Sequence, residues 1–252
     1  MANANHMKNI LIILPTYNES SDIASIVDVI RSQRLNMNVS VLIIDDNSPD
    51  GTGRIAYELS RKFKDVSVLN RETKLGLGKA YIEGFKFALA GNFDYLCEMD
   101  ADFSHDPRYL VDFCREIETH DLVLGSRYAE GVSIVRWPFL RLVLSFLANK
   151  FVKFVTGMPF TDCMGGYKCI STQLIRDITA DKIISKGYVF QMEILYRAYM
   201  MGARIKEIPI IFYNRKKGRS KMSKSDIFES FFIVLRLRFM LGFRRRRKQR
   251  GV

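Results

Sequence analysis

The stretch FDYLCEMDADFSHDP (Phe93–Pro107) joins a short apolar segment to a cluster of acids. Residues 93–98 are typical of a buried strand, and Asp100 and Asp102 follow at its end. Side chains two residues apart in extended backbone point to the same side, so these two carboxylates converge. Converging carboxylates either share a proton or bind a cation, and oxygen ligands suit Mg²⁺ or Mn²⁺. The stretch therefore predicts a strand that brings a metal-binding pair to the edge of a sheet.

Three further apolar segments precede this stretch, and each also ends in polar residues. These predicted strands cover residues 9–17, 39–46 and 66–72, and helical patterns occupy 18–33, 54–63 and 76–91. This alternation predicts an α/β fold with a mainly parallel sheet and right-handed crossovers. Ligands bind such sheets outside the carboxyl ends of the strands. We therefore expect one site built from Thr16–Glu19, Asp45 with Asp46, Asn70 with Arg71, and Asp100 with Asp102.

Each acidic pair also has a structural interpretation. The pair in the opening stretch could belong to a solvated acidic loop, but its place after a buried strand favours the metal site. Asp45 or Asp46 could accept hydrogen bonds from a ribose hydroxyl or a base N–H. The alternative is a capped turn, for which Asn47 and Asp50 are well suited.

The second half of the chain has a less regular pattern. We expect a strand at 121–128, a glycine-bearing turn at 162–171, a helix at 187–202, a strand at 204–215 and a basic loop at 218–223. Residues 137–160 are mostly apolar but include Arg141, Lys150 and Lys153.

Composition narrows the class of protein and its partners. The chain has 252 residues and a formal net charge of +12, which favours nucleic acid, anionic lipid or phosphorylated substrates. Its four cysteines form no C-x-x-C pair, which indicates free thiols in a reducing compartment. Neither a secretory signal nor a run of 18 apolar residues is evident. We therefore expect a protein on the cytoplasmic side, with no transmembrane helix of its own.

Two segments are candidates for contact with a membrane surface. Residues 139–155 and the tail 226–252 combine aromatic and aliphatic side chains with basic residues, as interfacial helices do. The tail ends in FRRRRKQR (Phe243–Arg250), which adds attraction to anionic lipid. The alternative is a helix packed in the core followed by a disordered basic tail.

Six motifs together resemble one enzyme family. PTYNE (15–19), DDNSPDGT (45–52), GLGKA (76–80), MDADFSHDP (99–107), GSRY (125–128) and GRSKMS (218–223) occur in this order. Their order and spacing resemble the polyprenol-phosphate glycosyltransferases of glycosyltransferase family 2, which include the dolichol-phosphate mannose synthases. The resemblance covers about residues 8–225. It implies a GT-A catalytic domain, with a nucleotide-sugar-binding half (8–125) and an acceptor half (126–225), followed by the amphipathic basic tail.

The resemblance implies roles for residues on the donor side. By position, nucleotide-sugar binding falls to Pro15, Tyr17, Glu19, Asp45, Asp46, Lys74, Asp100, Ala101 and Asp102. Asp100 and Asp102 would hold Mg²⁺ or Mn²⁺ against the diphosphate. Family members often have Gln two residues after the second aspartate, whereas this chain has Ser104. Ser104 is therefore the candidate third ligand, and a water molecule is the alternative.

The resemblance also implies a site for the acceptor phosphate. The matching positions are Arg127, Arg141, Ser145, Arg215 and Lys221, with Ser220 in the same basic loop. Arginine suits this role independently, because its fork of donors matches phosphate oxygens. Asp100, Asp102 and Arg127 are the expected catalytic residues. Glu193 is a candidate for orienting the sugar or the arginines, and for His105 a structural role beside Pro107 is favoured over that of a general base.

The resulting expectation is inverting, metal-dependent transfer of mannose from GDP-mannose to a polyprenyl phosphate. The acceptor is already an anion, so it needs no general base. A nearby alternative is transfer of glucose or another sugar from a UDP-sugar to the same lipid. A distant alternative is a basic nucleic-acid-binding protein, but acids at the ligand edge would repel a phosphate backbone. The sequence does not indicate an oligomeric state.

Overall fold

A seven-stranded sheet forms the centre of the computed structural model, which describes residues 7–185, 187, 189–214 and 231–241. The strand order is β3-β2-β1-β4-β7-β5-β8. The strands are β1 (Asn9–Thr16), β2 (Asn38–Asp45), β3 (Val66–Asn70), β4 (Tyr95–Glu98), β5 (Leu122–Ser126), β7 (Lys168–Ser171) and β8 (Ile205–Pro209). A separate parallel pair joins β6 (Ile134–Val135) to β9 (Phe212–Tyr213). The α/β architecture with a mostly parallel sheet is confirmed.

The first four strands are parallel neighbours, as the apolar segments predicted. β1 lies between β2 and β4, and its residues Ile10–Leu14 are almost completely buried because helices cover both faces. β1 ends at Thr16, one residue before the end of the predicted range 9–17. Pro15 is tolerated because β4 pairs with β1 only as far as Ile13.

β7 corrects the prediction for residues 162–171. Residues 162–167 form the expected turn, but residues 168–171 form β7. This strand lies in the sheet antiparallel to both β4 and β5. Lys168 lies opposite Glu98 in this pairing, and both side chains are fully buried. A buried lysine within a short segment gives little sign of a strand, which is why the sequence pattern failed there.

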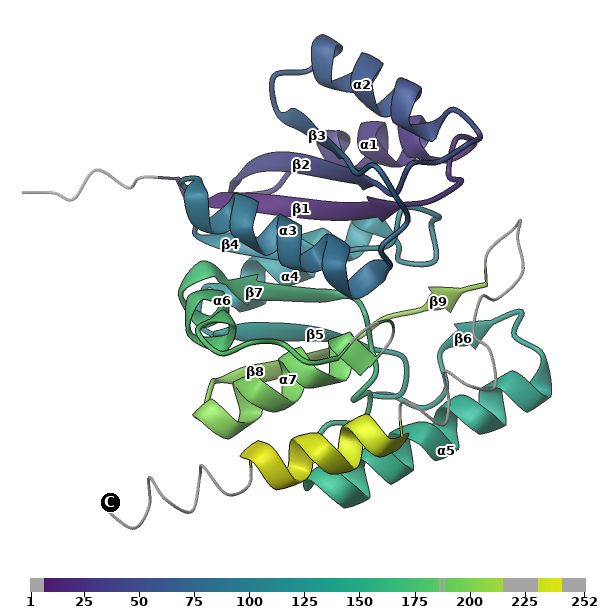
Figure 1. The fold of residues 1–252 in the computed structure, drawn as a ribbon, viewed down its shortest axis with the longest axis vertical. Helices are drawn as coiled ribbons and strands as arrows, with labels where there is room; N and C mark the ends of the chain where they lie inside the picture. The colour runs from purple at the N-terminus through teal and green to yellow at the C-terminus, as the bar shows by residue number, and fades with distance from the viewer. Residues whose placement is uncertain (1–6, 186, 188, 215–230, 242–252) are drawn as a thin grey trace, which may run out of the picture.

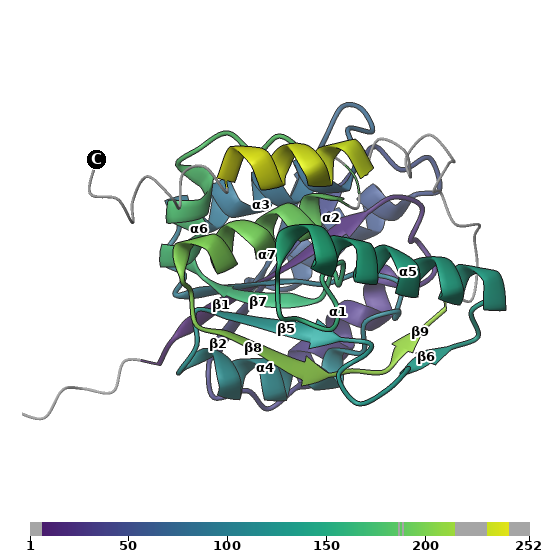
Figure 2. The ribbon, with the colours of Figure 1, turned by 90° about the horizontal axis from the view of Figure 1, so that it is seen from below.

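The molecule has three layers, with the sheet between a layer of helices on each face (Figure 2). One face packs against α3 (Leu77–Ala90), α6 (Thr172–Thr179), α7 (Val189–Met201) and the helix formed by residues 231–241. The other face packs against α1 (Ile23–Ser32), α2 (Thr52–Lys62) and α4 (Leu110–Ile117). The short helix η1 (Pro107–Tyr109) precedes α4, and the side chain of Asp106 accepts from the Arg108 N–H at its start. Asp106 thus caps the helix that Pro107 begins.

A long helix, α5 (Phe139–Thr156), lies beside the helix at residues 231–241 at one end of the molecule (Figure 1). The rings of Phe151 and Phe231 stack at 4.6 Å between these helices. Val152 is buried in the core, whereas Phe139, Leu140 and Phe154 are 79%, 69% and 88% exposed. No described helix combines the length and apolar character needed to cross a bilayer.

Candidate functional site

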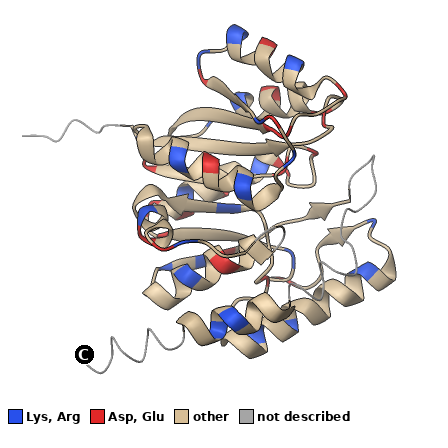
Figure 3. Cartoon of the chain, in the orientation of Figure 1, with Lys and Arg blue, Asp and Glu red and all other residues tan. Residues whose placement is uncertain are grey.

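The loops that follow β1, β2 and β4 carry acids at one edge of the sheet (Figure 3). Asp45 ends β2, and its carboxylate accepts from Thr16 Oγ1 at 2.9 Å, from Ser48 N at 2.9 Å and from Ser48 Oγ at 2.6 Å. Asn47 between them has a left-handed φ of 55°. Asp45 therefore holds the turn after β2, and of the two interpretations of this aspartate the contacts favour the structural one.

Asp46 forms a buried ion pair with Arg71, which follows β3. The second oxygen of Asp46 accepts from the backbone N–H of Gly76 at 3.1 Å, and Arg71 Nη2 donates to the Gly76 carbonyl at 3.1 Å. Gly76 has a φ of +90°, a conformation that favours glycine. Arg71 Nη1 is buried without a hydrogen-bond partner in the described part of the chain. Arg71, which the sequence placed at this edge of the sheet, is therefore a buried donor there, fixed by Asp46.

Two of the predicted nucleotide-binding residues lie against each other. The Lys74 ammonium lies 3.7 Å from the centre of the Tyr17 ring. The neighbouring turn is fixed by Asp50, which accepts from Ser20 N and from both the N–H and the hydroxyl of Thr52. Thr52 Oγ1 in turn accepts from the Glu19 N–H at 2.9 Å. An exposed cation and an aromatic ring beside ordered turns suit a base or a diphosphate.

The loop after β4 orients the two aspartates of the opening stretch. Phe103 has a left-handed φ of 60°, and the Ser104 N–H donates to Asp102 Oδ1 at 3.0 Å. Ala101 is buried and Asp100 is 28% exposed in its side chain. The Asp100 N–H donates to His105 Nδ1 at 3.0 Å. The loop is thus folded by its own side chains into a tight turn.

His105 is a structural residue of this loop, as the sequence favoured. Its ring is buried and stacks on Tyr167 at 4.7 Å. Burial lowers the pKa of His105 to about 3, although Asp102 acts in the opposite direction. A neutral ring is required here, because Nδ1 accepts the Asp100 N–H.

The donor set of this loop fits a hard divalent cation. It offers two carboxylates, with the buried Ser104 beside them. In the described ranges, no group of three or more His, Cys, Asp or Glu side chains could hold a metal ion by itself. Magnesium and manganese accept such partial sites, since they bind through one or two carboxylates together with phosphate oxygens and water. The residues therefore suit a metal shared with a phosphate-bearing ligand.

Arg127 lies in the loop after β5 and pairs with Asp162. Its Nε and Nη2 donate to the two oxygens of Asp162 at 2.6 and 2.8 Å, and its backbone N–H donates to the same carboxylate. Burial alone would raise the pKa of Asp162, but Arg127 outweighs it and lowers that pKa. The remaining side-chain nitrogen of Arg127, Nη1, donates no hydrogen bond to Asp162. The sequence did not predict this fixed orientation.

Arg141 and Ser145 of α5 have aromatic neighbours. The Arg141 guanidinium lies 4.0 Å from the centre of the Trp137 ring and donates from Nη1 to Asn214 Oδ1 at 3.1 Å. Ser145 Oγ accepts from the Tyr128 hydroxyl at 2.9 Å. Trp137 also faces Arg127 at 5.6 Å, so one ring lies near both arginines.

Not every predicted site residue belongs to this arrangement. Arg215, Ser220 and Lys221 lie outside the described residues. Glu193 is fully buried on α7 and accepts from the Ile184 and Ser185 N–H groups and from Arg197. These contacts correct the idea that Glu193 orients Arg127 or Arg141, because they tie α7 to the segment before it.

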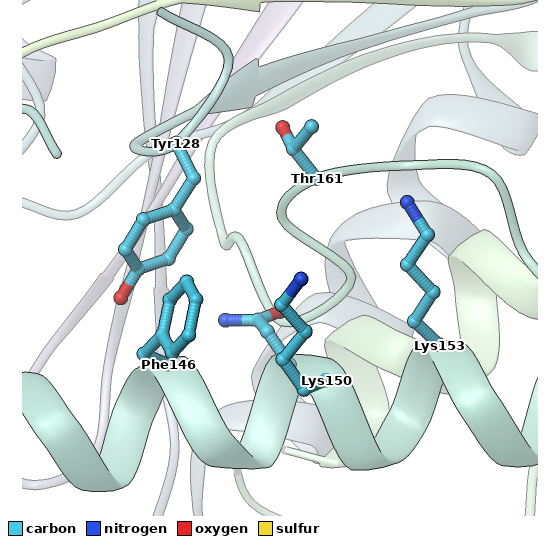
Figure 4. A pocket seen from close by; sticks show the side chains of 6 residues that line it. Tyr128, Phe146, Lys150, Lys153 and Thr161 are labelled. Atoms are coloured by element: carbon cyan, nitrogen blue, oxygen red, sulfur yellow. The ribbon is translucent and has the colours of Figure 1, made fainter. Parts of the chain in front are cut away.

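A small cavity lies between α5 and the loops that carry Tyr128 and Thr161 (Figure 4). Its volume is about 160 Å³, and Lys150 and Lys153 contribute to its lining. Phe146 faces Tyr128 edge-on at 6.3 Å. The cavity is thus cationic and aromatic, and it adjoins Ser145 through Tyr128.

A buried polar cluster lies in the layer behind the acidic loop. Lys168 donates to Gln191 and to the Gly165 carbonyl, and its ammonium is 3.6 Å from Glu98. Burial raises the pKa of Glu98 to about 7, against the effect of Lys168, and burial lowers the pKa of Lys168. Glu98 is the last residue of β4, two residues before Asp100, so the cluster supports the end of β4 from within.

Comparison with known proteins agrees with this arrangement. Residues 11–179 match the family model described as "Glycosyl transferase family 2". The chain belongs to glycosyltransferase family 2. It is therefore a glycosyltransferase, and the membership of family 2 that the six motifs indicated is confirmed.

Two curated relatives of this family 2 enzyme are similar over most of their length. A polyprenol monophosphomannose synthase from Mycolicibacterium smegmatis is 41% identical over 226 residues, which are 89% of this chain and 84% of the relative. An undecaprenyl-phosphate mannosyltransferase from Micrococcus luteus is 40% identical over 227 residues, 90% of this chain and 93% of the relative.

Solved structures share the GT-A-like fold of this family 2 enzyme. Glucosyl-3-phosphoglycerate synthase from Mycobacterium tuberculosis, in complex with Mn²⁺, UDP and glucosyl-3-phosphoglycerate, aligns with a TM-score of 0.65. The identity is 17%, over 93% of this chain and 80% of that chain. A second structure, described as a mycobacterial protein, aligns with a TM-score of 0.67 at 19% identity over 92% of this chain and 74% of that chain. At such identities the likeness shows the fold alone.

Proposed function

We propose that this glycosyltransferase moves mannose from a nucleotide sugar, GDP-mannose, to a polyprenyl phosphate. The observation that carries the proposal is the pair of relatives, 41% and 40% identical over about nine tenths of the chain, both named for mannose transfer or synthesis on a polyprenol. The geometry supports it, since the Phe212 ring lies 5.4 Å from His105 of the aspartate loop and 5.6 Å from the Arg127 guanidinium, so the two sites are neighbours.

The donor site lies at the carboxyl ends of β1 to β4. Tyr17 and Lys74 face each other there, and Arg71 offers a buried N–H. Asp100 and Asp102, with Ser104 as a possible third ligand, would hold Mg²⁺ or Mn²⁺. The bound cation would stabilise the negative charge that develops on the departing nucleoside diphosphate. A structural neighbour that binds Mn²⁺ together with UDP supports a divalent metal.

The acceptor site is formed by Arg127, Arg141 and Ser145. An acceptor phosphate bound by Arg127 Nη1 and by Arg141 is already anionic, so it attacks the sugar without a general base, and the attack inverts the anomeric carbon. Asp162 fixes the plane of the Arg127 guanidinium through two hydrogen bonds. Arg215 and Lys221 are further candidates for this phosphate.

A lipid acceptor requires contact with a membrane surface, and α5 is the element that suits this. Leu140, Leu147 and Phe154 are 69%, 55% and 88% exposed, and their spacing of seven residues places them on one face. Lys150 and Lys153 flank this face beside the cavity of Figure 4. We infer a peripheral enzyme at the cytoplasmic face of a membrane, with α5 lying in the interface.

A matrix of donors and acceptors tests the function. Purified enzyme is incubated with GDP-mannose, UDP-glucose or UDP-N-acetylglucosamine, with dolichyl or undecaprenyl phosphate, and with Mg²⁺, Mn²⁺ or EDTA. We expect polyprenyl phosphate mannose only with GDP-mannose, and none with EDTA. Product only from UDP-glucose would replace the donor in this proposal with that sugar. Absence of any lipid-linked sugar under all conditions would contradict the function itself.

A further inference from the structure

The strand β9 contacts both halves of the site. Its backbone pairs with β6 through bonds from Phe212 N to the Ser133 carbonyl at 2.9 Å and from Asn214 N to the Val135 carbonyl at 3.0 Å. Between these, the Tyr213 N–H donates to the Ser104 carbonyl at 3.3 Å. One short strand is thus bonded on one side to the acceptor half and on the other to the loop of the two aspartates.

The side chains of β9 repeat this bridging. The Phe212 ring lies edge-on to Trp137 at 5.5 Å and edge-on to His105 at 5.4 Å. Trp137 carries Arg141 on its face, while His105 accepts the Asp100 N–H. Phe212 and Trp137 are half-buried, and because their rings are in contact a displacement of one acts on the other. The Phe212 ring therefore links the metal-binding loop, through His105, to the acceptor arginine Arg141, through Trp137.

Asn214 controls the position of Arg141. Its Oδ1 accepts from Arg141 Nη1 at 3.1 Å, and its Nδ2 donates to the Arg136 carbonyl at 3.1 Å. Phe212 and Asn214 are two residues apart, so they lie on the same side of the strand. A phosphate that binds Arg141 Nη1 competes with Asn214 Oδ1 for this donor. A phosphate that binds the guanidinium elsewhere moves Arg141 and the bonded Asn214 amide together.

We propose that Phe212 and Asn214 are positioning residues that couple acceptor-phosphate binding to nucleotide–metal binding. A phosphate on Arg141 shifts the Asn214 amide and the Trp137 ring, and β9 passes this shift to Ser104 and His105. Each substrate thus favours the binding geometry of the metal-binding loop, and the second substrate then binds more tightly. This inference rests on the proposed function, because it requires one enzyme to bind both a nucleotide sugar and a polyprenyl phosphate.

The coupling is measured by binding, without turnover. Calorimetry gives the Kd of GDP with Mn²⁺ in the absence and presence of saturating farnesyl phosphate, a short polyprenyl phosphate. In the wild-type enzyme we expect farnesyl phosphate to tighten GDP binding by roughly 5-fold or more, and GDP to tighten farnesyl phosphate binding by the same factor. In Phe212→Leu and Asn214→Ala we expect this ratio to fall to about one, with GDP binding alone unchanged.

Tyr213→Ala is the matched control. It lies on the same strand with its side chain on the opposite side, and the backbone bond to Ser104 does not depend on the side chain. This variant should retain the wild-type ratio. A wild-type ratio of one, or the wild-type ratio preserved in both Phe212→Leu and Asn214→Ala, would overturn the inference.

Hydrogen exchange on the wild-type enzyme tests the same coupling without depending on the folding of a variant. Farnesyl phosphate alone, with no nucleotide or metal, should slow amide exchange in residues 99–106. Unchanged exchange there would also overturn the coupling. The matrix of donors and acceptors distinguishes the proposed function from the coupling through β9. Mannose transfer without coupling would refute only the role of β9. Absence of both nucleotide binding and transfer would refute the function and the coupling together.

Discussion

Asp102 combines two tasks at the scale of a single residue. One oxygen accepts the Ser104 N–H and shapes the turn, and in the proposed site its charge would help to hold a divalent cation. Asp102→Asn keeps an acceptor for the turn but removes the charge. We expect transfer to fall by more than the roughly 10–100-fold that loss of an outer partner of a metal ligand costs. The measurement is the initial rate of lipid-linked mannose formation across a Mn²⁺ titration.

The melting temperature of the same variant distinguishes a loss of metal binding from damage to the fold. Mn²⁺ with GDP should raise the melting temperature of the wild-type enzyme and not that of Asp102→Asn. Asp177→Asn, an exposed aspartate on α6, is the matched control and should behave as wild type. A wild-type rate for Asp102→Asn would remove this residue from the metal site.

Asp50 shows how a turn at the ligand edge depends on pH. Partial burial would raise its pKa, but hydrogen bonds from Thr52 and Ser20 outweigh this and lower it from 3.8 to about 2. A carboxylate with a lowered pKa stabilises the fold above its unfolded value, and this contribution is lost as the pH falls through the folded value. The advantage of wild type over Asp50→Asn in unfolding free energy should therefore shrink between pH 4 and pH 2. Urea denaturation at stepped pH checks this, and a constant difference would contradict it.

At the scale of elements, a buried ion pair helps to fix the loop between α5 and β7 to the loop after β5, beside the Ser126–Thr161 hydrogen bond at 2.7 Å. Asp162 is fully buried and Arg127 is 11% exposed in its side chain. Asp162→Ala leaves the guanidinium without its carboxylate, and removing one partner of a buried pair costs about 3–5 kcal/mol. Guanidinium chloride denaturation measures the loss. The exposed pair of Arg115 with Asp112 is the control, since Asp112→Ala should cost only about 0–1 kcal/mol. Equal losses would show that Asp162 is not the anchor.

Periodic patterns predicted the elements whose burial is regular. β1 to β4 and their helices have a continuous apolar strand or one buried helical face, so local sequence contains their signal. β7 was missed because its alignment depends on a lysine that pairs with Glu98 across the sheet. The orientation of Arg141 was missed for a similar reason, because Asn214 lies 73 residues away in the chain. Contacts of this kind become visible only when the topology is known.

At the scale of the whole molecule, the site and the exposed face of α5 belong to one arrangement. Arg141 and Ser145 lie on the same helix as Leu140, Leu147 and Phe154, so a helix lying in the membrane interface would present the acceptor arginine near the phosphates of the lipid. Arg141, Lys150 and Lys153 on this helix favour anionic lipid at the same surface. The tail beyond residue 241, where the basic run lies, is outside the described residues and stays a prediction as a second membrane contact.

The exposed aromatic side chain of Phe154 tests this orientation. It is 88% exposed, and moving a Phe side chain from water into an apolar phase contributes about 1.5–3 kcal/mol. Phe154→Glu should therefore weaken binding to vesicles of anionic and zwitterionic phospholipid by about 10-fold or more, as measured by flotation. Tyr57→Glu on α2, where the native side chain is 55% exposed, is the matched control and should float as wild type. Transfer to farnesyl phosphate in detergent-free solution should be the same in both variants, because neither residue contacts the donor loop or the acceptor arginines. Equal flotation of Phe154→Glu and wild type would place the membrane contact elsewhere on the molecule.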